Sequence, residues 1–214
     1  MLKLILNAHL KAISFIWVLW VFYFVQIVCA VSGVNLAEIF GLQPRSISGL
    51  SGIVCMHFLH GSLMHIVLNS IGLFMVLVPL YMAFEKEAHM PETIIKIVLI
   101  SGILLWVFGR QYSGNGQYLL THVGASALSY GLTFYMIFAG FLFRNAFLLV
   151  VSMANLFWTG SALIEGFNPS HIEISWEGHL CGAVAGILVA IIQKNQMPTK
   201  LPMEEHHEIG PHRL

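Results

Sequence analysis

Three short groups of polar side chains interrupt a chain that is otherwise strongly apolar. The groups are His60, His65 and Asn69; Ser126 and Tyr130; and His179. A serine hydroxyl becomes a nucleophile when an imidazole can accept its proton, and side-chain N–H donors can stabilise the oxyanion that forms. The residue types therefore predict acyl-transfer chemistry, with a serine nucleophile, a histidine base and donors from histidine and asparagine.

The spacing within each group indicates helices. His65 and Asn69 are four residues apart, as are Ser126 and Tyr130, so each pair shares one helix face. Gly182 and Gly186, one turn beyond His179, form a small-residue face of the kind that lets two helix backbones approach closely in lipid. Ala127 and Gly131 form a second such face beside Ser126. Close approach is what a hydrogen bond between a serine and a histidine on different helices requires.

The composition places these helices in a membrane. The chain has 214 residues, of which 57% are hydrophobic and only 9% are charged, against about a quarter charged in soluble domains. The formal net charge is zero, so no basic surface indicates a nucleic-acid partner. All ten acidic residues are glutamates, which excludes an aspartyl dyad or a triad with Asp, and no HExxH string supports a zinc protease.

Six apolar segments are long enough to cross a bilayer. We predict an all-α, six-span membrane domain over residues 1–193, with a first loop at about 33–59 and a cytoplasmic tail at 194–214. The predicted spans are Ala12–Ser32, His60–Met82, Thr93–Gly109, Gly124–Phe141, Asn145–Leu163 and Gly178–Gln193.

The cations orient this bundle, because Lys and Arg concentrate on the cytoplasmic side. Only Arg45 and Arg110 fall on the predicted outer side. Eight cations fall on the other side: Lys3, Lys11, Lys86, Lys96, Arg144, Lys194, Lys200 and Arg213. Both termini are therefore predicted to be cytoplasmic. Each polar group opens an even-numbered span, so all three groups are expected at one depth, just below the outer surface.

Each group also has a structural explanation when it is taken alone. A serine in a membrane helix usually bonds to a carbonyl one turn earlier, and His65 with Asn69 could simply join two helices. The catalytic interpretation is favoured because one mechanism uses all three groups at the same time.

The ordered set of motifs resembles the rhomboid intramembrane serine proteases. The similarity covers roughly residues 41–193. It includes the segment Gly41-Leu-Gln-Pro-Arg45, the spacing His60, His65 and Asn69, the triplet Gly124-Ala-Ser126, and His179 followed by Gly182 and Gly186. One departure is Ala127, which stands where the family usually has glycine. Glu85 is a plausible counterpart of the family's acidic residue after the second span.

The resemblance implies a Ser126–His179 dyad that needs no metal or cofactor. Tyr130 would pack on the His179 ring, and the oxyanion hole would comprise His65, Asn69 and the Ser126 N–H. His60 would support the site and Arg45 would order the first loop. The substrates implied are transmembrane segments of other membrane proteins in the lipid bilayer, and the small six-span chain is typical of a bacterial plasma membrane.

Two other interpretations remain at this stage. A rhomboid-like pseudoprotease would keep the fold, bind membrane proteins and lack activity, and Ala127 is the feature that favours it. A metal or haem protein would use the many histidines, which number eleven. Against the haem hypothesis, His60 and His65 would lie about 140° apart on an ideal helix, given about 100° per residue.

Overall fold

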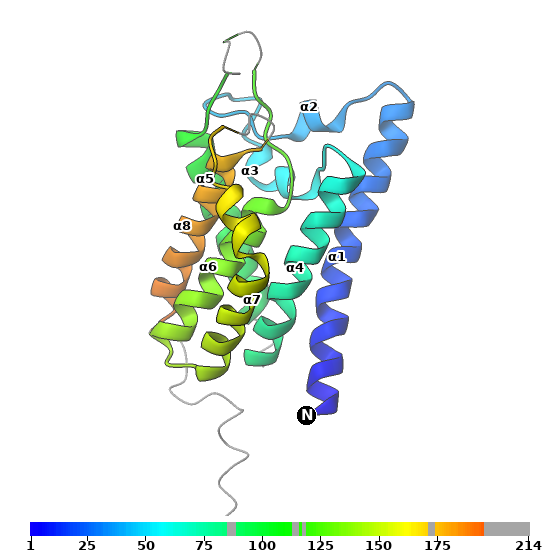
Figure 1. The fold of residues 1–214 in the computed structure, drawn as a ribbon. Coiled ribbons are helices and arrows are strands. Elements are labelled where there is room, and N and C mark those ends of the chain that lie inside the picture. Colours follow the sequence, from blue (N-terminus) through cyan, green and yellow to red (C-terminus); the bar gives the residue numbers. More distant parts are fainter. Residues whose placement is uncertain (85–88, 113–115, 117–118, 171–173, 195–214) are drawn as a thin grey trace, which may run out of the picture.

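The computed structural model describes residues 1–84, 89–112, 116, 119–170 and 174–194. In these residues the regular structure is helical (Figure 1). The helices are α1 (Leu2–Val31), α2 (Leu36–Phe40), α3 (Gly52–Cys55), the short 3₁₀ helix η1 (Met56–Phe58), α4 (Leu63–Ala83), α5 (His89–Phe108), α6 (Ser126–Leu142), α7 (Ala146–Glu165) and α8 (Trp176–Gln193).

Five of these helices, namely α1, α4, α5, α7 and α8, are long and apolar enough to cross a bilayer, and α6 is a shorter apolar helix of 17 residues. The chain is thus an all-α integral membrane protein, as its composition predicts. The largest difference from the predicted spans is at the start of α1, which begins at Leu2 and not at Ala12. Hydropathy locates only the part of a helix that suits lipid. The helix itself extends back to Leu2, because no Gly or Pro precedes Gly33 to interrupt it.

The alternating direction of the helices brings the starts of α4, α6 and α8 to one end of the bundle. Figure 1 shows α2 and α3 at this same end, while the N-terminus lies at the opposite end. We call the end with α2 and α3 the loop end. The three polar groups of the sequence therefore occupy the loop end, because each lies at or just before the start of one of these helices.

The central contact of the bundle is between α6 and α8, and two glycines of α8 make it possible. A Cβ on Gly182 would lie 2.0 Å from the Ala127 carbonyl oxygen, and one on Gly186 would lie 1.9 Å from that of Gly131. Both distances are far below van der Waals contact, so the two backbones meet only where α8 has no side chain. This contact sets the separation of α6 and α8 immediately beyond Ser126 and His179.

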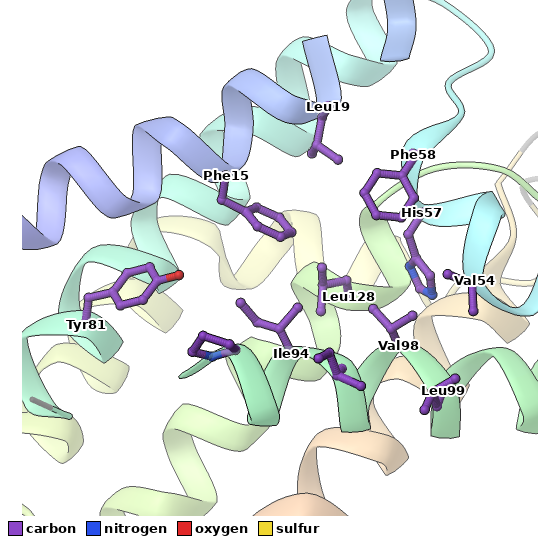
Figure 2. A pocket seen from close by; sticks show the side chains of 12 residues that line it. Phe15, Leu19, Val54, His57, Phe58, Tyr81, Ile94, Val98, Leu99 and Leu128 are labelled. Carbon is purple, nitrogen blue, oxygen red and sulfur yellow. The ribbon is translucent and has the colours of Figure 1, made fainter. Parts of the chain in front are cut away.

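Helix α1 is peripheral and buries few residues. Ala8, Ala12 and Leu19 are its buried positions, and it packs mainly against α4. Between α1, α5 and η1 lies an apolar pocket of about 360 Å³, with Phe15, Leu19 and the His57 ring among its lining side chains (Figure 2). Burial lowers the pKa of His57, so this imidazole is neutral at physiological pH.

Some sequence predictions fall on residues outside the described part of the chain. These are Glu85 and Lys86, and the tail from residue 195 onward with Lys200 and Arg213.

We expect Gly186→Ala to destabilise the protein, because the new methyl group would overlap the Gly131 carbonyl oxygen. Overpacking of this kind typically costs about 1–3 kcal/mol, which a lower apparent melting temperature in detergent would reveal. The matched control is Gly160→Ala in α7, where an added Cβ meets no atom within 4 Å. Equal melting temperatures for the two variants would contradict the close α6–α8 contact.

Candidate active site

Ser126 is the first residue of α6, and the backbone just before it is shaped by Gly124. Gly124 has φ +119°, a left-handed conformation that favours glycine, and its N–H donates to the Met56 carbonyl at 2.8 Å. A Cβ at this position would lie 2.5 Å from the His65 ring and 3.5 Å from Asn69 Nδ2. Gly124 therefore lets both side chains approach the chain two residues before Ser126.

His65 and Asn69 come from the first two turns of α4. The helix begins at Leu63 because the Ser62 side chain caps it, accepting from the His65 N–H at 3.1 Å. Asn69 is buried, and its Nδ2 has no hydrogen-bond partner among the described residues. A buried, unpaired donor beside Gly124 is suited to an oxygen atom that arrives with a substrate.

His60 lies in the connection before α4, so the expectation that a helical span includes it is wrong. Because it is not on the helix, the predicted 140° separation from His65 does not apply. Instead the two rings pack edge to face, with centroids 5.2 Å apart. His60 Nε2 accepts from the Ala125 N–H at 3.4 Å, and the Gln26 side chain bonds both backbone groups of His60. Burial, reinforced by the neighbouring His65, lowers the pKa of His60 and keeps it a neutral acceptor.

His179 is held by two contacts that together define its orientation. Its ring stacks on Tyr130, with centroids 4.2 Å apart and planes 2° from parallel. Its Nδ1 donates to the Gly166 carbonyl oxygen at 2.7 Å. Since a carbonyl can only accept, Nδ1 carries the proton and Nε2 keeps a free lone pair. The imidazole is thus in the tautomer of a general base, and a carbonyl takes the orienting place that Asp has in a triad.

The Tyr130 ring is fixed in turn from α7. Its hydroxyl donates to the Leu163 carbonyl at 3.0 Å. A Cβ on Gly166, the residue that closes α7, would lie 1.9 Å from the Tyr130 hydroxyl and 2.9 Å from His179 Nδ1. The sequence analysis missed Gly166, because a single glycine after an apolar helix has no distinguishing pattern.

Ser126 and His179 lie in the first turns of adjacent helices. No hydrogen bond joins their side chains within the described residues. Catalytic hydrogen bonds are often long in ligand-free enzymes and tighten when substrate binds. Ala127, which follows the serine, is buried beside Leu42, Leu105 and Cys181, so its methyl group is accommodated in the core.

Arg45 lies in the connection between α2 and α3 and joins it to the end of α5. Its Nη1 donates to the carbonyl oxygens of Val107 and Gly109, each at 2.8 Å. The backbone N–H of Arg45 donates to the Trp106 carbonyl oxygen at 2.9 Å. The Arg45 backbone is in the left-handed region, with φ +54°. Arg45 thus contacts backbone groups that lie beyond its own loop.

The histidines do not gather into a metal centre within the described residues. There, no three His, Cys, Asp or Glu side chains are placed to hold a metal ion. The histidines of the tail lie outside the described part of the chain.

Comparison with known proteins identifies the family of the chain. A family model described as Rhomboid domain matches residues 47–196. The chain belongs to the rhomboid family. Uncharacterised proteins of Mycobacterium bovis and Mycobacterium tuberculosis are each 30% identical to this rhomboid over 173 residues, which make up 79% of this chain and 70% of theirs. One of Mycobacterium leprae is 26% identical over 155 residues, which are 71% of this chain and 59% of that one.

We expect the His179 ring of this rhomboid to be protonated at Nδ1 and unprotonated at Nε2, because the Gly166 carbonyl can only accept. Nitrogen-15 NMR of protein labelled in its histidine rings distinguishes the two tautomers, and the His179 signals are assigned by their loss in His179→Gln. A proton on Nε2 with none on Nδ1 would contradict the observed orientation of the ring.

Proposed function

We propose that this rhomboid is an active intramembrane serine endopeptidase, with Ser126 as nucleophile and His179 as general base. The observation that carries the proposal is the His179 ring, which is stacked on Tyr130 and donates from Nδ1 to Gly166. These contacts support a base role, because they orient the ring and leave its second nitrogen without a hydrogen-bond partner among the described residues. His179 lies in the first turn of α8, next to the helix that begins with Ser126.

The chemistry follows from these positions. Ser126 Oγ attacks the scissile carbonyl carbon while His179 Nε2 accepts the hydroxyl proton. His179 then donates this proton to the leaving amine, the peptide C–N bond breaks, and an acyl-enzyme ester remains on Ser126. Water, deprotonated by His179, hydrolyses the ester and restores the free serine.

The oxyanion is stabilised by three groups in this proposal, which are the Ser126 N–H, the Asn69 Nδ2 and the His65 ring. The approach of both α4 side chains to Gly124 supports it, because that glycine immediately precedes the serine turn. Preorganised donors of this kind are effective where water is excluded, since they need no reorientation during the reaction.

The substrate class proposed is the transmembrane helix of another membrane protein. A helical backbone engages its carbonyls in hydrogen bonds, so the segment must unwind before Ser126 can attack it, and Gly or Pro in the substrate would favour unwinding. We propose that cleavage occurs near the outer surface of a bacterial plasma membrane, with both termini of the enzyme cytoplasmic. The cations support this orientation, because Lys3, Lys11 and Lys96 lie toward the N-terminal end of the bundle, whereas Arg45 lies at the loop end.

Ala127 is compatible with activity in this proposal. Ala127 is only 4% exposed, and Gly182 leaves room for the α6 backbone at this residue. The replacement of the family's usual glycine therefore leaves the α6–α8 contact intact. A pseudoprotease would share this packing, so the test must measure chemistry at Ser126.

We expect Ser126→Ala and His179→Gln each to abolish cleavage of a membrane-anchored reporter in proteoliposomes, because either change removes one half of the dyad. Ser129→Ala, one turn further along α6, is the matched control and should cleave normally. Labelling by a fluorophosphonate should be present in the wild type and Ser129→Ala and absent in Ser126→Ala. Unlabelled wild-type protein that also fails to cleave would identify a pseudoprotease.

We expect Asn69→Ala to retain partial activity, because two oxyanion donors remain. Loss of one such donor typically lowers kcat by about 10²- to 10³-fold. Steady-state cleavage in proteoliposomes should show this fall mainly in kcat, with KM little changed. Wild-type kcat in Asn69→Ala would exclude this side chain from the oxyanion hole.

A further inference from the structure

Four polar residues form a cluster beside the candidate site, at the loop end of the bundle. Arg110 follows α5, His122 precedes α6, and Ser175 and Glu177 begin α8. We call these four residues the outer polar cluster. None of them has a role in the proposed chemistry, although His122 is four residues before Ser126 and Glu177 is two residues before His179.

An ion pair between Arg110 and Glu177 is the core of the cluster. The guanidinium meets the carboxylate with two nitrogens: Nε contacts Oε1, and Nη2 donates to Oε2 at 3.2 Å. The Glu177 side chain is 7% exposed and that of Arg110 is 33% exposed. Within the described residues the other ion pair, Glu92–Lys96, lies inside α5, so Arg110–Glu177 is the one that joins two elements. A paired, two-point contact of this kind restricts geometry more than a single hydrogen bond does.

A chain of hydrogen bonds runs beside the ion pair. Ser175 Oγ accepts from the Gly178 N–H at 3.2 Å as the cap of α8, and it lies 2.6 Å from His122 Nδ1. His122 Nε2 lies 3.3 Å from the Arg110 carbonyl oxygen. Because that carbonyl can only accept, Nε2 carries the ring proton and Nδ1 accepts from the Ser175 hydroxyl. Burial lowers the pKa of His122, which favours this neutral form.

The cluster connects the two segments that lead into the proposed dyad. On the α6 side, the His122 backbone is paired with Leu42 through both its N–H and its C=O, at 2.8 and 3.0 Å. On the α8 side, Glu177 and Ser175 hold the first turn of the helix. Residues two apart on a helix are about 200° apart, so Glu177 and His179 lie on different faces of α8, and no hydrogen bond joins their side chains in the described residues.

We propose that Arg110 and Glu177 are a positioning pair, which sets the separation of Ser126 and His179 by joining the start of α8 to the end of α5. The inference rests on the proposed function, because a fixed separation matters only if the two residues react together. Beyond Gly182 the glycine contacts with α6 hold α8, whereas the turn that carries His179 depends on the cluster and on Gly166.

The kinetic test compares Glu177→Gln with Glu92→Gln, which removes the ion pair within α5. We expect Glu177→Gln to lower kcat by about 10- to 100-fold with KM within about twofold, because a small displacement of a reacting group has an effect of this size. Glu92→Gln should leave both constants unchanged. The double variant Arg110→Gln/Glu177→Gln should lose no more kcat than Glu177→Gln alone, because the two residues act as a unit. Wild-type kcat in Glu177→Gln, or independent losses in the double variant, would overturn the proposal.

A second measurement does not depend on activity. In the inactive Ser126→Ala protein, amide hydrogen exchange in residues 174–182 should accelerate when Glu177→Gln is added, while exchange in α4 stays unchanged. Unchanged exchange in residues 174–182 would overturn the positioning role of Arg110 and Glu177. Equal acceleration throughout the protein would also overturn it, because that result indicates only a loss of global stability. Wild-type protein that cleaves no reporter would instead overturn the proposed function, so the two failures are distinguishable.

Discussion

The backbone contact between α6 and α8 is the constraint on which the rest of the structure depends. Two glycines of α8 lie against the carbonyl oxygens of Ala127 and Gly131, so that the two helices are closer than any side chain would permit. In lipid, contact between apolar side chains contributes little free energy to helix association, because the lipid tails are equally apolar. Close packing of the helix backbones therefore supplies much of the stabilisation. The same contact holds α6 beside α8, so Ser126 and His179, which are 53 positions apart in the sequence, lie in the first turns of neighbouring helices.

Backbone carbonyls in this protein orient histidine rings, a task that a carboxylate performs in a Ser-His-Asp triad. The Gly166 carbonyl fixes the tautomer of His179, and the Arg110 carbonyl fixes that of His122. A neutral acceptor suits a buried site in a membrane protein, because it orients the ring without adding a charge that must be desolvated. The lack of aspartate in the sequence is consistent with this solution. The Glu177 carboxylate lies two residues before His179, and it is paired with an arginine.

The alternating direction of the helices and the gathering of the polar groups at one end could be predicted because they follow from the number and order of the apolar spans, which hydropathy reveals. Hydropathy alone also gave most helix ends to within a few residues. The start of α1 was missed because hydropathy responds to lipid compatibility and not to helix continuity. His60 was placed on a helix because the Ser62 cap was not recognised. The contacts of Gly166 with His179 and of Arg110 with Glu177 could not be predicted from the sequence, because they join segments that are far apart along the chain.

The lengths of the helices have a consequence for solvent. At about 1.5 Å per residue, the 17 residues of α6 rise about 26 Å, less than a hydrocarbon core of about 30 Å, whereas the 30 residues of α1 rise about 45 Å. A helix too short to span the hydrocarbon core leaves the rest of that thickness to the segments that adjoin its ends. Ser126 is the first residue of α6 and lies at the loop end, where α2 and α3 also lie. The length of α6 is thus consistent with a serine that lies below the membrane surface, as the proposed function requires.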